Sequence, residues 1–135
     1  MARTLAENTV WSYKQSRRVR GVDIVCVIKS AELPLKAMVG RTVFVSNIVN
    51  QARVEFGERD YLVLVSEFVD GFQAKGLDRT EIVDGVGTPI AGLRIKETID
   101  GQALTFEAMA PNAEPEARFS DPTRQVFRIH CKRVE

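Results

Sequence analysis

The chain has 135 residues, among them 19 basic residues, 18 acidic residues, one histidine and two cysteines. This length predicts one domain that buries a core without help from disulfides or a metal. The near balance of charge argues against a general nucleic-acid-binding domain, which would be strongly basic.

Residues 1–16 are predicted to form an N-terminal arm or a short helix. Thr4 is a suitable N-cap, and Glu7 three positions later completes the pattern of a capping box. Trp11 and Tyr13 have two interpretations. They anchor the arm on a neighbouring subunit, or they pack on the domain to which they belong.

Four positive charges then fall within seven residues, which predicts either a patch that contacts phosphates or an acidic partner, or a solvated junction before the first strand. A single β domain is expected over 17–135. Two further cations on its last strand extend the possible basic patch to six residues: Lys14, Arg17, Arg18, Arg20, Arg128 and Lys132.

The first half of that domain reads as strands separated by breaks. Runs rich in β-branched residues indicate buried strands, whereas proline and charged glycine-containing segments indicate turns. The sequence predicts strands at 22–28, 36–45 and 61–65, a break at 32–34, the far side of a loose hairpin at 46–56, and a charged turn at 57–60.

The segment after residue 65 is ambiguous, because Leu62, Val65, Phe68 and Phe72 also fit a helical spacing. We expect a strand followed by irregular structure. Residues 70–88 are rich in turn residues and are predicted to form a second long connection.

A tight hairpin is predicted at 93–108. The Asp-Gly turn at 100–101 suits a two-residue loop with positive φ at both positions. This register places apolar residues opposite each other on one face and opposite charges on the other. Its central pairs are Ile95 with Phe106 and Arg94 with Glu107.

The closing strand alternates from 125 to 134. Phe127, Ile129 and Cys131 share one face, and Arg128, His130 and Lys132 share the other. The loop at 110–124 before it contains three prolines and is long enough to be a contact loop. Taken together, the short strands predict a mainly β fold, namely a small antiparallel β-barrel or sandwich with long loops.

The sequence offers no constellation for catalysis. His130 and Cys131 point to opposite faces of their strand, so they do not form a nucleophilic pair or ligate one ion. His130 is expected to be an exposed or interface residue. Cys26 and Cys131 are expected to be reduced core thiols, with a disulfide between adjacent strands as the alternative. We therefore expect no enzyme activity, no cofactor and no metal site.

Localisation follows from two further features of the sequence. No apolar leader follows Met1, and no run approaches the roughly 18 apolar residues of a membrane helix. We expect a soluble protein that is made in a cytoplasm and has no membrane partner.

Five short motifs carry a family resemblance over about residues 17–134. They are VGRT at 39–42, ERDYLV at 58–63, IKETIDG at 95–101, SDP at 120–122 and RIH at 128–130. In this order and spacing they resemble the small head–tail joining proteins of tailed bacteriophages, of the neck stopper or head-closure type.

The resemblance implies a β-barrel-like subunit of the virion, made in the host bacterial cytoplasm. It implies a ring, a hexamer, between the portal–adaptor assembly and the tail terminator or tail-tube proteins. Such a ring would retain packaged double-stranded DNA and later let it pass without reading its sequence. Residues 70–88 and 110–124 are the expected contact loops with ring neighbours or the next ring. The candidate interface residues are Trp11, Tyr13, Phe72, Phe119 and Asp121. The alternatives are a tail terminator or other tail-tube-proximal protein, and a nucleic-acid-binding β-barrel.

Overall fold

The computed structural model describes residues 4–40, 59–109 and 115–134. Seven strands and three helices form the described part of the chain. In chain order they are α1 (Leu5–Arg20), β1 (Val22–Ile28), β2 (Ala31–Gly40), β3 (Arg59–Leu64), α2 (Val65–Ala74), α3 (Arg79–Ile82), β4 (Arg94–Ile99), β5 (Gln102–Ala108), β6 (Ala117–Phe119) and β7 (Val126–Arg133).

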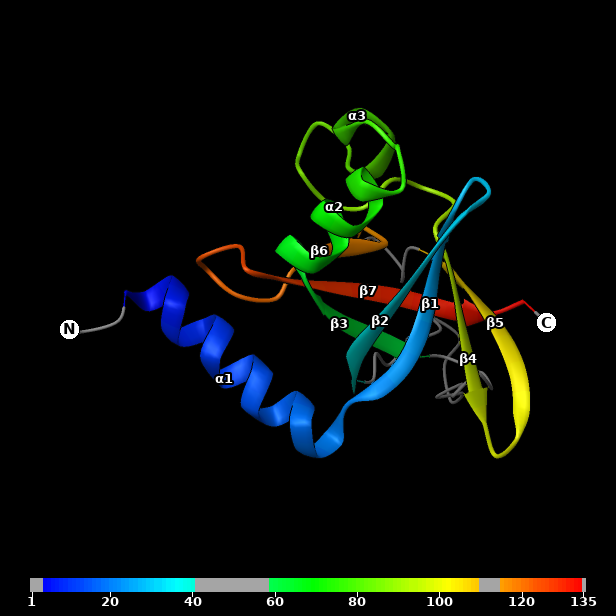
Figure 1. The fold of residues 1–135 in the computed structure, drawn as a ribbon, viewed down its shortest axis with the longest axis horizontal. Helices are drawn as coiled ribbons and strands as arrows, with labels where there is room; N and C mark the ends of the chain where they lie inside the picture. Colours follow the sequence, from blue (N-terminus) through cyan, green and yellow to red (C-terminus); the bar gives the residue numbers. More distant parts are fainter. Residues whose placement is uncertain (1–3, 41–58, 110–114, 135) are drawn as a thin grey trace, which may run out of the picture.

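Six of the strands close into an antiparallel barrel (Figure 1). The strand order is β3-β2-β1-β4-β5-β7-β6, and a further pairing between β3 and β7 completes the ring. The short strand β6 pairs with 127–129 of β7, next to the part of β7 that pairs with β5. The prediction of a mainly β fold with a short N-terminal helix is confirmed, and the closed barrel is the form it takes.

The hairpin of β4 and β5 has the predicted register. Arg94 lies opposite Glu107 and Ile95 lies opposite Phe106. Asp100 and Gly101 form the tip with φ values of 52° and 79°. Only glycine and a few short polar residues adopt this region readily, which explains the Asp-Gly pair.

The barrel interior holds one apolar cluster. It takes every second residue of the strands, including Cys26, Ile95, Phe106 and Phe127, all at most 1 % exposed. Cys26 and Cys131 are both buried and both free thiols, as expected. Burial raises the pKa of Cys26 to about 12 and also raises the pKa of Cys131.

The segment after β3 is helix α2, so the expected irregular structure is wrong. Phe68 and Phe72 lie on one face of α2 and are fully buried in the barrel's core cluster. The Phe68 ring packs edge-to-face on Phe127 with centroids 5.5 Å apart. A Cβ atom at Gly71 would lie 2.7 Å from the Leu33 methyl groups, so the absent side chain lets α2 approach β2 closely.

Two expected breaks are also wrong. Residues 32–34 lie inside β2, where Pro34 pairs with Val25 of β1. The proline is tolerated because β3 pairs only with residues 38–40 of β2, so that edge needs no donor at Pro34. Residues 59–60 begin β3 instead of forming a turn. The remainder of that turn, the end of the strand expected at 36–45 and the hairpin strand at 46–56 lie outside the described residues.

Helix α1 begins with the predicted capping box. The Glu7 amide donates to Thr4 Oγ1 at 3.1 Å, and the Thr4 amide donates back to Glu7 Oε1 at 3.5 Å. The helix continues to Arg20, so the basic cluster lies on the helix and not on a junction before the first strand. Cations in the last turn interact favourably with the helix dipole.

Candidate interaction surfaces

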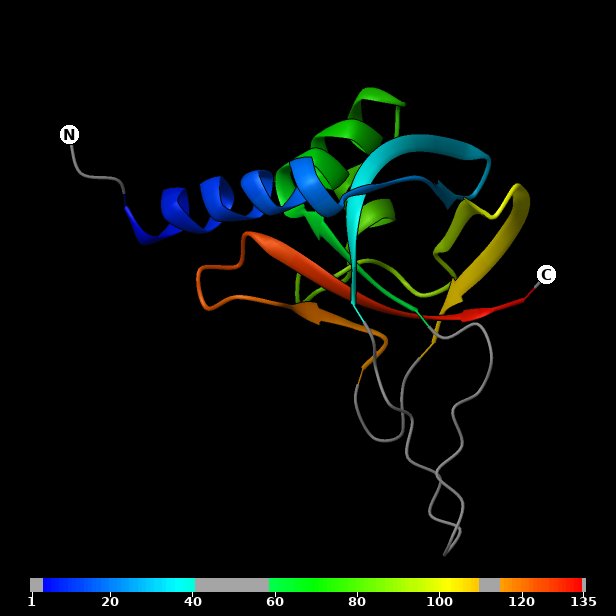
Figure 2. The ribbon, with the colours of Figure 1, turned by 90° about the horizontal axis from the view of Figure 1, so that it is seen from below.

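The N-terminal half of α1 extends away from the barrel (Figures 1 and 2). Tyr13 is its only buried residue, and its hydroxyl donates to the backbone carbonyl of Leu62 on β3. Burial raises the pKa of Tyr13 to about 12, so the hydroxyl keeps its proton. Leu5 and Trp11 are 65 % and 48 % exposed. An apolar, largely unburied helix surface is available to a partner.

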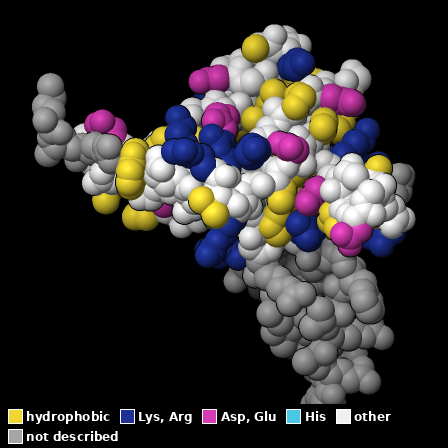
Figure 3. Space-filling model, turned by 60° about the horizontal axis from the view of Figure 1, so that its bottom comes forward, with side chains coloured by type: hydrophobic (Ala, Val, Ile, Leu, Met, Phe, Trp, Pro, Cys, Tyr) yellow, Lys and Arg dark blue, Asp and Glu magenta, His cyan; other side chains and the backbone are white. Residues whose placement is uncertain are grey.

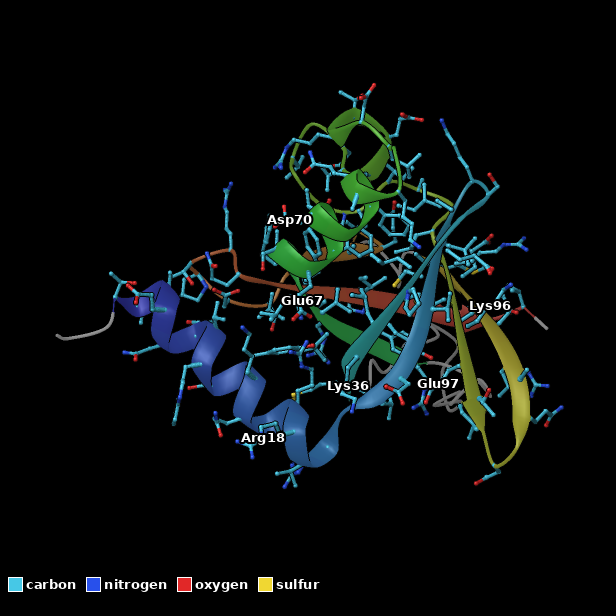
Figure 4. All side chains as sticks on the ribbon, viewed as in Figure 1. Arg18, Lys36, Glu67, Asp70, Lys96 and Glu97 are labelled. Atoms are coloured by element: carbon cyan, nitrogen blue, oxygen red, sulfur yellow. The ribbon has the colours of Figure 1, made fainter. Side chains whose placement is uncertain are left out.

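A groove of about 660 Å³ lies where α1, β2 and α2 meet. The seven residues that line it define what we call the cationic groove: Lys14, Arg17, Arg18, Pro34, Leu35, Lys36 and Glu67. Figure 4 labels three of them, Arg18, Lys36 and Glu67, which come from the three different elements. Figure 3 shows Lys and Arg side chains gathered near the barrel end of α1.

Arg17 fixes the geometry of this groove. Its guanidinium binds both carboxylate oxygens of Glu67, with Nη2 at 3.1 Å from Oε2, and Nη1 donates to the Lys36 carbonyl at 3.3 Å. The hydrogen bond to Glu67 raises the pKa of Arg17 further. This bidentate pair ties α1 to α2. Lys14, Arg18 and Lys36, the other cations of the groove, are therefore carried by elements whose relative position this pair helps to fix.

A buried polar cluster joins β3 and β7. Asp60 is fully buried, and its carboxylate accepts from Arg128 Nε at 2.7 Å and lies 3.0 Å from His130 Nδ1. Asp60 and His130 are opposite each other in the strand register. The expectation of an exposed or interface His130 is wrong, because this residue is 1 % exposed and has a carboxylate as its neighbour. The cluster acts as a cross-strand link.

A second polar cluster lies on the inner side of the barrel. Tyr61 donates to Glu97 Oε1 at 2.7 Å, and Arg59 Nη2 donates to Glu97 Oε2 at 3.2 Å. Burial, together with the neighbouring Glu97, raises the pKa of Tyr61. These contacts join β3 to β4 across the barrel interior, which supports a structural role for Glu97.

Two exposed loops are each ordered by one aspartate. Asp84 accepts from the amides of Val86, Gly87 and Thr88 at 2.9–3.2 Å. Asp121 accepts from the amides of 123, 125 and 126 at 2.8–3.0 Å. Desolvation opposes ionisation of both groups, but these hydrogen bonds outweigh it and lower the pKa of each carboxyl. The loops are thus held in one conformation.

The predicted interface residues have different environments. Phe72 is fully buried and Tyr13 is 7 % exposed, so neither reaches a partner in this conformation. Phe119 is half-buried on Phe127, with ring centroids 5.4 Å apart, and Asp121 orders the next loop. Trp11 keeps an exposed ring.

The predicted basic patch divides into two groups. Lys14, Arg17 and Arg18 line the cationic groove and Arg20 ends α1, whereas Arg128 and Lys132 lie on β7 and not in the groove. Lys36 and Glu67 complete the groove but were missed in the sequence. The helical spacing in 62–72 is the signal that would have placed Glu67 on a helix surface.

The described residues contain no group of three or more His, Cys, Asp or Glu side chains placed to hold a metal ion. Within the same residues, no helix combines the length and the hydropathy needed to cross a membrane.

Comparison with known proteins decides the family. A family model described as phage head-tail joining protein matches residues 3–135. The chain belongs to this family. No curated protein and no solved structure matches it. Membership supports a structural role at the phage head–tail interface, a location in the virion, and interaction with head and tail components.

Proposed function

We propose that this member of the joining family is the stopper, or head-closure, subunit of the phage neck. Six copies form a ring between the portal–adaptor assembly and the tail terminator or tail-tube proteins. The ring retains packaged double-stranded DNA until infection and then lets it pass. The role is mechanical and involves no catalytic step, cofactor or sequence-specific contact with DNA.

The match of the family model to residues 3–135 is the observation that carries this proposal. The fold suits the role because a closed barrel is a stiff frame from which other elements project. Helix α1 and the two aspartate-ordered loops are such elements. A ring subunit needs contacts to the copy beside it and to the rings above and below it, and loops on a rigid scaffold provide these.

The Asp60 cluster argues against the nucleic-acid-binding barrel. Binding of single strands needs aromatic rings beside an open basic groove. On β7, Arg128 is bound to Asp60 and His130 is buried, so the cationic face expected for this strand is not open to a nucleic acid.

The test is to delete the gene from the phage that encodes the chain and to image the particles. We expect heads that package DNA but lose it and carry no tail, with both defects repaired by the wild-type gene. Cryo-electron microscopy of intact particles should then show the ring on the portal–adaptor assembly. A ring at the end of the tail tube would identify a tail terminator, and normal particles without the gene would refute a neck role.

A further inference from the structure

The balanced total charge hides a strong separation of charge along the chain. Helix α1 has four basic residues and one acidic residue, a net charge of +3. Outside the groove, residues 70–88, which end α2 and contain α3, have four acidic and two basic residues, a net charge of −2. Surfaces of opposite sign on one molecule are complementary between copies.

Helix α3 and the basic end of α1 lie apart in space, with α2 between them (Figure 1). In Figure 1, α3 is at the top of the view and the basic end of α1 is at the bottom. An isologous contact centred on either surface would press that surface against its own copy, and like charges would repel. A head-to-tail contact instead brings the basic surface of one copy to the acidic surface of the next. Such a contact forms a ring when the rotations between successive copies add up to one full turn.

The cationic groove has charge available for this contact. Arg17 is bound to Glu67, but Lys14 and Arg18 make no ion pair within the described residues. Lys36 lies 4.0 Å from the highly exposed Asp23, at the limit of an ion pair. Pro34 and Leu35 add apolar surface between these cations. The groove therefore suits an acidic surface that also carries an apolar side chain.

The opposite surface has that composition. Three exposed carboxylates, those of Asp70, Asp78 and Asp84, define what we call the acidic face. Val86, two residues after Asp84, lies in the loop that Asp84 orders and is 70 % exposed. Because the loop is already ordered, little conformational entropy is lost when it binds.

We propose that copies of this chain join head to tail, with the cationic groove of one copy receiving the acidic face and Val86 of the next. This inference rests on the proposed ring and names its contact surfaces. The occupant of the groove is a second copy because the same chain presents the complementary charge and the apolar tip. The alternative occupant, the phosphate backbone of DNA, has no need of the apolar floor.

The experiment uses two full-length variants with matched charge changes. Lys14→Glu with Arg18→Gln lowers the net charge of the groove by three. Asp70→Lys with Asp78→Asn raises the net charge of the acidic face by three, and asparagine preserves the N-cap of α3. Arg118→Glu, at an exposed position on β6, is the control. Circular dichroism melting verifies that each variant folds, and Lys14→Gln with Arg18→Gln replaces the groove variant if it does not.

Ring loading is measured by co-sedimentation with DNA-filled, tail-less heads, and oligomers are measured by native mass spectrometry. We expect each variant alone to load roughly tenfold less or worse, and Arg118→Glu to load normally. A mixture of the two variants should form a 1:1 dimer that does not extend, because one intact groove meets one intact acidic face.

Three results would overturn the proposed contact. They are normal loading by either variant, a mixture that stays monomeric, and a groove variant that loads normally but loses salt-sensitive retention of double-stranded DNA. Failure of the proposed function is a separate outcome, in which the wild-type chain itself forms no ring on heads.

Discussion

The Asp60 cluster should hold β3 to β7 and therefore keep the barrel closed. We consider Asp60→Ala, which removes the carboxylate between Arg128 and His130. Asp60 is fully buried and the Arg128 side chain is 24 % exposed, so water replaces the lost acceptor poorly. The guanidinium would be left partly buried without this carboxylate.

The expected cost follows from the two contacts. Each hydrogen bond to a charged group contributes about 1.5–3 kcal/mol, and breaking a buried ion pair costs about 3–5 kcal/mol. We therefore expect Asp60→Ala to lower the free energy of unfolding by about 3–5 kcal/mol. Small domains have only about 5–15 kcal/mol in total, so this change is large. Asp60→Asn keeps the volume and one acceptor and should cost about 1–3 kcal/mol.

The assay is urea unfolding followed by far-ultraviolet circular dichroism, because Trp11 lies on α1 and does not report on the barrel. The matched control is Glu107→Gln. It removes the Arg94–Glu107 pair, which also joins two strands, with Nε at 3.3 Å from Oε1, but lies near the surface. Exposed pairs contribute less than about 1 kcal/mol. If Asp60→Ala costs no more than this control, the cluster does not hold the barrel closed.

Three further predictions concern other contacts. Tyr13→Phe removes the bond to the Leu62 carbonyl and should cost about 1 kcal/mol, with faster hydrogen exchange in α1. The pKa of Asp121 is lower in the folded protein than in the unfolded chain. The ionised carboxylate therefore stabilises the fold fully above the ordinary carboxyl pKa, and this stabilisation is lost as the pH falls through the lower pKa of the folded state. Asp121→Asn should thus lower the free energy of unfolding at neutral pH. In urea titrations at several pH values, this free energy should also fall less steeply toward acid pH than in the wild type. Burial raises the pKa of both Cys26 and Cys131, so a thiol reagent at pH 8 should react with them only as fast as the protein opens.

The hairpin of β4 and β5 could be predicted because its determinants are local. The turn at 100–101 sets the loop, and the cross-strand pairs agree with only one register. Strand β1 and the inward face of β7, with Phe127, Ile129 and Cys131, follow equally from short-range alternation. Each of these elements is specified by residues within about a dozen positions of one another.

Helix α2 was missed because its sequence supports two structures. The apolar residues of 61–72 fit both a strand continuing from β3 and a helix face. Tertiary packing decides between them, since only the helix places Phe68 and Phe72 together in the barrel's core. The helix also places Glu67 beside Arg17, 50 residues earlier in the chain.

The burial of His130 could not be predicted for a related reason. It depends on the pairing of β7 with β3, which brings Asp60 opposite a residue 70 positions later. The alternation of β7 correctly puts His130 on the face away from the barrel interior. It does not show that this face is covered, so it predicts an exposed His130.

Barrel closure determines which parts of the chain remain available to join subunits. A ring subunit could offer unpaired strand edges to its neighbours, but the β3–β7 pairing removes such edges from the six barrel strands. In the ring that we propose, the contacts between copies therefore come from elements outside the barrel. Helix α1 and residues 65–88 are the two largest of these in the described chain, and they carry opposite net charge. The same closure that makes the subunit rigid thus leaves a charged head-to-tail contact as the simplest way to assemble it.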